Sequence, residues 1–295
     1  MPSNRYYHTV SSNKVVICGT YNSAAYKFAK ASGFSFVRSD PVTVAAGKSA
    51  NLGVAGKRAL TYTSSNTQVA TVSDKGVVKG IAPGTATITV KAAKTGNFDA
   101  ITKTVSVTVT KCETPLVSKV QNVNGGVKIT FNTVPGVAKY RIYYKIGNGT
   151  WTRAADVTSS PYTWKKAVSG KTYIFTVRAL NQYGKYISDY NKTGKKITYA
   201  ATPTLSTVSN NKSRTVTATW KKCTGITGYN VQYSIYKNFK SYKLVKIAGA
   251  SKVSKAIGSL TKGKTYYVRI RSYKTVSGKT YYSGWSPAKA VKITK

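Results

Sequence analysis

Hydrophobic and polar residues alternate with a period of two along much of the chain. From residue 66 onward, the runs QVATV, VVKGI and TATITVKA follow one another, separated by turns at 73–76 and 82–84 that contain Gly or Pro. Alternating runs with such turns at roughly 8–12-residue spacing predict the strands of a β-sandwich. The pattern returns in VSVTVT at 105–110, so we predict one sandwich over 41–110.

The second half of the chain contains an internal repeat. VKITFNTVPGVAKYRIYY at 127–144 aligns with VTATWKKCTGITGYNVQY at 216–233, and GKTYIFTVRAL at 170–180 aligns with GKTYYVRIRSY at 263–273. Self-similarity of this kind indicates two copies of one structural unit. We therefore predict two further sandwiches, at 111–199 and 200–295.

Large aromatic residues recur at matching positions in the two copies. They fall on the alternating positions that face a sandwich core, and we expect them to be buried. These residues are Phe131, Tyr140, Tyr173, Trp220, Tyr229 and Tyr266.

Residues 1–40 follow a different pattern. We predict strands at 6–10, 14–18 and 34–37 and a helix over about 21–31, begun by Thr20 or Asn22 and ended by Gly33. A segment this short rarely buries enough surface to fold alone. Its aromatic side chains must pack on the following sandwich or on a larger assembly, and we favour an anchor in an assembly. These side chains are Tyr6, Tyr7, Tyr21, Tyr26, Phe28, Phe34 and Phe36.

The net charge of the chain is strongly positive and indicates what kind of partner it binds. The chain carries 47 Lys and Arg against 6 Asp and Glu, a net charge of +41, and no acidic residue follows Asp189. Such a surface keeps the protein soluble and attracts polyanions. In the last predicted sandwich we take six lysines as candidate polyanion contacts: Lys237, Lys240, Lys243, Lys246, Lys262 and Lys264.

The sequence offers little for catalysis or metal binding. Acid–base chemistry needs placed carboxylates or an oriented His, whereas the six acids are scattered and His8 is the single His. Phosphate-loop, nucleophile-elbow and metal-ligand motifs are absent. The cysteines Cys18, Cys112 and Cys223 fall one per segment, which is not a disulfide framework. We expect no catalytic residues, no metal and no cofactor.

Two family resemblances follow from these residues. SSNTQVATVSDKGVVKGIAPGTATITV at 64–90 resembles a bacterial immunoglobulin-like group 2 domain. The two repeats resemble fibronectin type III domains, with Phe131 or Trp220 in the second strand and Tyr173 or Tyr266 at the tyrosine corner. The fold class is therefore all-β, with three tandem Ig-like or fibronectin-like sandwiches after a short N-terminal anchoring segment.

The start of the chain bears on where such domains act. Residues 1–13 are polar and aromatic and do not read as a secretory signal, and no apolar run approaches the roughly 20 residues of a membrane span. Ig-like and fibronectin-like domains also decorate tailed-phage particles, which are released by lysis. The resemblance thus implies a non-enzymatic virion structural protein on the particle surface, with capsid or tail proteins and anionic cell-surface polymers or glycans as partners.

Two alternatives stay open. A secreted adhesin of a Gram-positive cell wall fits the domains and the lysine content, and would place the protein outside the cell. A nucleic-acid-contacting virion protein fits the charge, but the lysines are spread through all strands and no reader motif is present, so we expect no specific nucleic-acid binding. Homo-oligomerisation is compatible with all three.

Overall fold

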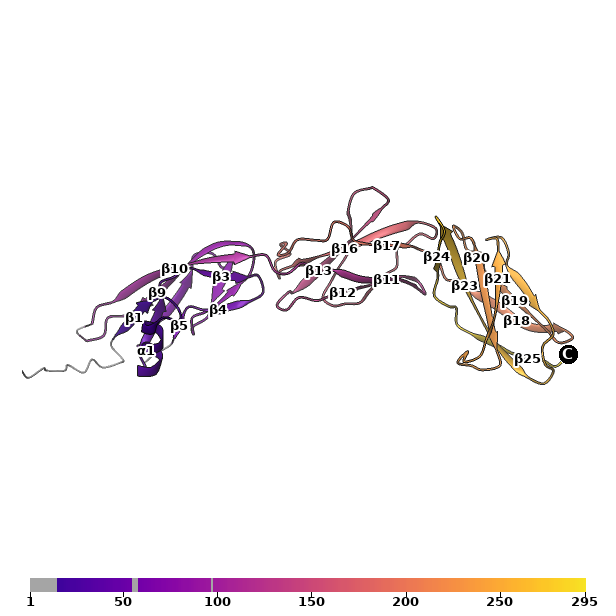
Figure 1. Cartoon of the computed structure of the whole chain (residues 1–295), viewed down its shortest axis with the longest axis horizontal. Coiled ribbons are helices and arrows are strands. Elements are labelled where there is room, and N and C mark those ends of the chain that lie inside the picture. Colours follow the sequence, from indigo (N-terminus) through magenta and orange to yellow (C-terminus); the bar gives the residue numbers. More distant parts are fainter. Residues whose placement is uncertain (1–14, 55–57, 97) are drawn as a thin grey trace, which may run out of the picture. The chain divides into compact units, whose positions relative to one another are not determined.

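The computed structural model describes residues 15–54, 58–96 and 98–295, whose regular secondary structure is almost entirely β-strand (Figure 1). The all-β fold expected from the alternating pattern is confirmed. The chain divides into two compact units, one formed mainly by the residues up to Pro115 and the other mainly by those from Tyr190, with the segment between shared by both.

The N-terminal part of the described chain forms β1 (Val16–Gly19), α1 (Ala24–Ser32) and β2 (Ser35–Arg38). Ser23 is the N-cap of α1, and its side chain accepts a hydrogen bond from the Tyr26 N–H at 3.2 Å. Thr20 and Asn22, the predicted caps, do not begin the helix: an N-cap needs extended backbone, and Asn22 has a φ of 63°. Gly33 ends the helix in the left-handed conformation, as predicted.

These elements share a sheet with the residues that follow. β2 pairs in parallel with β1 and in antiparallel fashion with β5 (Gly53–Val54). Phe36 is completely buried, and the Ser35 hydroxyl donates a 2.7 Å hydrogen bond to the Arg58 carbonyl oxygen. The segment therefore packs on the neighbouring part of its own chain. The predicted strand at 6–10 lies outside the described residues.

The first sandwich has one sheet of four strands and one of three. The larger sheet has the order β3 (Val42–Ala45), β10 (Ile101–Thr110), β9 (Gly84–Ala92) and β6 (Thr61–Ser64). The smaller has the order β4 (Ser49–Asn51), β8 (Val77–Gly80) and β7 (Ala70–Val72). In β10 the buried valines alternate with exposed Ser and Thr, so the two-residue period read from VSVTVT is the period of core and solvent contact.

The second sandwich also consists of a three-stranded and a four-stranded sheet. Its three-stranded sheet has the order β11 (Val117–Val123), β12 (Gly126–Phe131) and β15 (Tyr162–Trp164). Its four-stranded sheet has the order β14 (Thr152–Val157), β13 (Lys139–Ile146), β16 (Thr172–Leu180) and β17 (Lys195–Thr198).

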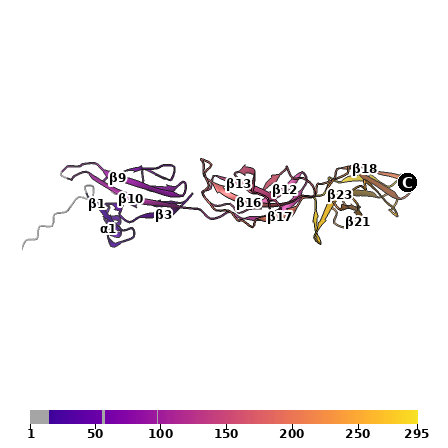
Figure 2. The same ribbon diagram turned by 90° about the horizontal axis from the view of Figure 1, so that it is seen from above.

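The third sandwich repeats the topology of the second. β18 (Leu205–Lys212), β19 (Thr215–Trp220) and β22 (Ser254–Ile257) form the smaller sheet. The larger sheet has the order β21 (Lys243–Ala248), β20 (Gly228–Ser234), β23 (Thr265–Val276) and β24 (Lys279–Tyr282), and β25 (Lys289–Lys292) also pairs with β23. β21 is thus an edge strand. Figure 2 labels β21 and β23 of the larger sheet and β18 of the smaller one. The repeat in the sequence is a repeat of strand order; the proposed limits at 110/111 and 199/200 remain predictions.

The aromatic residues shared by the two copies also share their hydrogen bonds. The Tyr173 and Tyr266 hydroxyls each accept from a backbone N–H five residues upstream, at 2.8 and 3.2 Å. Tyr140 and Tyr229 each accept from an N–H six residues upstream, at 2.6 and 2.9 Å. Buried phenols need such partners. Phe131, Trp220, Tyr140, Tyr173 and Tyr229 are buried, and Tyr266 is half-buried.

We expect Phe36→Ala to destabilise the first sandwich by about 3–5 kcal/mol, because it opens a cavity where a fully buried ring packs. Hydrogen exchange of the β9 and β10 amides, read by mass spectrometry, measures the change. Phe28→Ala is the matched control, since the Phe28 side chain is 57% exposed. Equal, small effects of the two changes would contradict a structural role for the N-terminal segment.

Candidate polyanion-binding surface

Positive charge dominates the third sandwich. Residues 200–295 contain 19 Lys and Arg and no Asp or Glu. The ion pairs of the described chain all use earlier acids: Arg38 with Asp40, Lys111 with Asp189, and both Arg141 and Arg153 with Asp156. The side-chain cations of the third sandwich must therefore be satisfied by neutral groups, by solvent or by a ligand.

The middle of β23 places two arginines on the outer face of the larger sheet. Val268 and Ile270 are buried in the core, so Arg269 and Arg271 point the opposite way. In the ladder with β20, Arg269 lies opposite Gln232 and Arg271 opposite Asn230. The Arg269 Nε donates to the Gln232 Oε1.

Aromatic rings surround both guanidinium groups. The Arg269 Cζ lies 4.0 Å from the centre of the Phe239 ring and 4.7 Å from that of Trp285. The Arg271 Cζ lies 4.5 Å from the Trp285 ring centre and 3.9 Å from that of Tyr282. These are cation–π distances. We call these five residues the basic-aromatic face.

Burial lowers the pKa of both arginines. Desolvation lowers the pKa of Arg269, and the neighbouring charge of Arg271 lowers it further. Desolvation also lowers the pKa of Arg271, while the Tyr282 and Tyr242 phenols act in the opposite direction. Both side chains stay charged at neutral pH, because the ordinary pKa of a guanidinium lies far above neutrality. The face therefore holds two partly desolvated positive charges side by side.

The six predicted lysine contacts gather at one end of the third sandwich. Lys237 and Lys240 lie in the loop between β20 and β21, and Lys243 opens β21. Lys262 and Lys264 lie in the turn before β23, which starts beside the end of β20 because the two strands are antiparallel. Lys246 lies further along β21 on the outer face, with its Nζ 5.2 Å from the Tyr273 ring centre. All six are exposed.

The aromatic residues predicted to anchor the N-terminal segment differ in how far they are exposed. Tyr21 and Tyr26 pack together with ring centres 4.6 Å apart, and Tyr26 meets the buried Phe36 edge-on at 5.3 Å. Phe28 and Phe34 stack at 5.8 Å, and Phe28 is exposed. Tyr6 and Tyr7 lie outside the described residues. The structure thus leaves Phe28 as the described aromatic of this set most open to an assembly contact.

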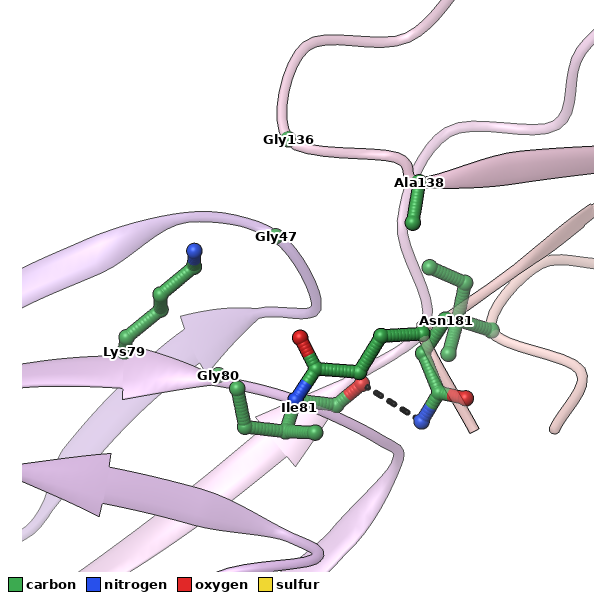
Figure 3. Close-up of a pocket in the computed structure, with 9 residues that line it drawn as sticks. Gly47, Lys79, Gly80, Ile81, Gly136, Ala138 and Asn181 are labelled. Atoms are coloured by element: carbon green, nitrogen blue, oxygen red, sulfur yellow. Dashed lines mark hydrogen bonds between the residues drawn. The ribbon is translucent and has the colours of Figure 1, made fainter. Parts of the chain in front are cut away.

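A small pocket lies in the first compact unit (Figure 3). Its lining includes the glycines Gly47, Gly80 and Gly136, and Lys79 is its one charged side chain. The Asn181 Nδ2 donates to the Ile81 carbonyl oxygen at 3.2 Å, as the dashed line shows. The lining lacks a carboxylate, His or Cys, so we assign no chemistry to it.

Reactive side chains form no further site in the described part of the chain. No group of three or more His, Cys, Asp or Glu that could hold a metal occurs among the described residues. Cys18 is exposed, Cys112 is buried and Cys223 is half-buried, each as a free thiol. Burial raises the pKa of Cys112 and Cys223. Within the described chain, no helix has the length and apolar character needed to cross a membrane.

Sequence reasoning missed the basic-aromatic face. The signal was present: YVRIRSY alternates strictly, so burial of Val268 and Ile270 already directs Arg269 and Arg271 outward. What the sequence did not show is that Phe239 and Trp285, from separate loops, close over the two guanidinium groups.

Comparison with known proteins identifies part of the chain. Residues 37–105 match the model of the bacterial Ig-like domain (group 2), as predicted for 41–110. No curated protein matches the chain. A crystal structure of chicken CNTN1 FN1–FN3 domains is 17% identical, covers 74% of this chain and 78% of its own, and has a TM-score of 0.28. A two-domain fibronectin type III segment of chicken tenascin is 17% identical, with coverages of 61% and 99% and a TM-score of 0.32.

We expect Trp285→Ala to destabilise the third sandwich by about 2–3 kcal/mol, because its ring contacts two guanidinium groups. Urea-dependent hydrogen exchange of the β20 and β23 amides measures the effect. Trp151→Ala is the control in the second sandwich: that half-buried ring has a lysine Nζ at 4.9 Å, and we expect a loss of about 1 kcal/mol. A larger loss for Trp151 would show that the arginine contacts contribute little.

Proposed function

We propose that this chain is a non-enzymatic structural protein of a bacteriophage particle, of the capsid-decoration or tail-fibre type. In this proposal its N-terminal segment contacts other virion proteins of the capsid or tail. Its sandwiches stand on the virion surface, stabilise the particle and adhere to anionic polymers or glycans of the host surface.

One observation carries the adhesive part of the proposal: the third sandwich has 19 basic residues and no acidic side chain. Six of its lysines are exposed at one end or on the outer face of the larger sheet. A surface of one sign raises the local concentration of an oppositely charged polymer. Sandwich cores built from paired sheets tolerate such a surface because the charges point away from the core.

The match of residues 37–105 to a bacterial Ig-like domain supports a bacterial or phage surface setting. It favours a second candidate equally well, a secreted adhesin that binds a Gram-positive cell wall. Both candidates bind through the same basic surface. They differ in whether the protein is part of a virion or is attached to a cell wall. A nucleic-acid-contacting virion protein stays a weaker alternative, because the lysines do not track a groove lined by open aromatic faces.

Mass spectrometry separates the two candidates. Purified particles and washed cell walls are prepared from an induced culture of the bacterium whose genome encodes the chain. The proposal expects the chain in many copies per particle. Its presence on cell walls and absence from particles would replace the virion assignment with the adhesin.

We expect the full chain to bind washed bacterial cell walls with an affinity that falls about tenfold or more between 0.05 and 0.2 M salt, since release of counterions and charge screening weaken polyanion binding. Sedimentation with cell walls measures this. Replacing Lys237, Lys240, Lys243 and Lys246 by Gln should weaken binding and flatten the salt dependence.

The control for this experiment removes the same charge from the first sandwich. Lys75, Lys79, Lys91 and Lys103 are exposed there and are replaced by Gln. We expect this variant to bind more tightly than the first. Equal binding by the two variants would show that total charge, and not the third sandwich, drives adhesion.

A further inference from the structure

The basic-aromatic face contains a polar group that the protein does not satisfy. The Arg271 Nε is buried and has no hydrogen-bond partner. Leaving a buried donor unpaired is costly, and more so for a charged group. The neighbouring Arg269 adds like-charge repulsion, which appears as a lowering of its pKa by Arg271. Stacking on aromatic rings explains where the side chains lie, but it leaves this donor and this repulsion uncompensated.

The second sandwich shows how the same position is satisfied elsewhere in the chain. Arg178 aligns with Arg271, and its Nε donates to the Ser188 carbonyl oxygen at 2.8 Å. Thr176 aligns with Arg269, so the second sandwich has no paired guanidinium there, and the Thr176 hydroxyl donates to the Asn191 carbonyl oxygen at 2.7 Å. The paired guanidinium groups, with the unpartnered Arg271 Nε, are therefore a feature that the aligned positions of the second sandwich lack.

No acidic side chain of the third sandwich can neutralise the pair, because none follows Asp189 in the sequence. Because both arginine side chains are only half-buried, an external anion is the natural complement of their charge, and guanidinium groups bind carboxylates, sulfates and phosphates through paired N–H donors.

Exposed phenols lie on the elements that carry two rings of the basic-aromatic face, Phe239 and Tyr282. Tyr242 is 55% exposed, Tyr236 49% and Tyr282 41%, and all three lie on β24 or in the loop between β20 and β21. The same loop holds Phe239 with a φ of 55°, a conformation unfavourable for a bulky residue. The loop thus accepts local strain while its Phe239 ring stays on Arg269.

We propose that the basic-aromatic face is a binding site for an acidic polysaccharide. The acid groups of the polymer bind Arg269 and Arg271, and sugar rings contact the exposed phenols of Tyr242 and Tyr236. This inference rests on the proposed adhesion to anionic polymers and names the site and the ligand class for it. Lys246 lies opposite Asn230 on the same outer face as Arg271, and it attracts a neighbouring acid group of the same polymer.

The geometry favours a polysaccharide over a nucleic acid. Phe239, Trp285 and Tyr282 each have a guanidinium over the ring, so these faces are occupied. Base stacking needs open ring faces in series along a backbone groove. What the face offers instead is guanidinium and phenol donors, which suit carboxylates and sugar hydroxyls.

The test uses the full chain and three polymers: polygalacturonate, neutral dextran and single-stranded DNA. Binding is measured by biolayer interferometry at 0.15 M salt. The site variant is R269Q/R271Q. The control is K212Q/K255Q, which removes the same charge from exposed positions on the smaller sheet of the same sandwich.

We expect the site variant to bind polygalacturonate at least about thirtyfold more weakly, since each lost charged hydrogen bond is worth about a factor of ten or more. The control should lose about twofold to threefold, and dextran should not bind. Equal losses in the two variants would overturn the site while leaving adhesion by diffuse charge intact. Tighter, site-dependent binding of DNA would overturn the ligand class.

Two further variants keep the test valid if R269Q/R271Q unfolds. R269K/R271K preserves both charges and most of the packing; we expect a loss of about tenfold, because lysine cannot make the paired contacts of a guanidinium. Tyr242→Ala changes an exposed ring and should weaken polygalacturonate binding about threefold to tenfold with folding unchanged. Unchanged binding in both variants would contradict the proposal.

Discussion

Each residue on a strand of a two-sheet sandwich faces either the core or the outside, and its neighbours face the other way. This alternation is the constraint on which the other features depend. In β23 it buries Val268 and Ile270 and sends Arg269 and Arg271 to the outer face. A strand that must build a core can therefore carry a dense row of cations at no cost to that core.

The outer face of the third sandwich stays positively charged because no acidic side chain follows Asp189 in the sequence. In the second sandwich, Asp156 pairs with Arg141 and Arg153, so that one carboxylate offsets part of their positive charge. In the third, aromatic rings contact the arginines instead, and rings hold a cation without cancelling its charge. The sandwich is thus ordered around positive groups that remain available to an anion.

Local patterns were predictable from the sequence. The alternation in β10, the Gly33 cap and the tyrosine hydrogen bonds of the repeats all depend on residues close together in the chain. Non-local pairings were not. The parallel pairing of β1 with β2 and the antiparallel pairing of β2 with β5 have no sequence signature, because strands this short leave no characteristic pattern. The closure of Phe239 over Arg269 depends on a loop conformation with positive φ, which propensities do not predict for phenylalanine.

The edge position of β21 has a second physical meaning. An edge strand exposes unpaired backbone N–H and C=O groups, which can recruit a strand from another molecule and start aggregation. Lys243 and Lys246 lie on this strand, and a second copy docking edge to edge would bring like charges together. The lysines that attract a polyanion therefore also oppose edge-to-edge aggregation of the protein. A protein displayed at high local density benefits most from that protection.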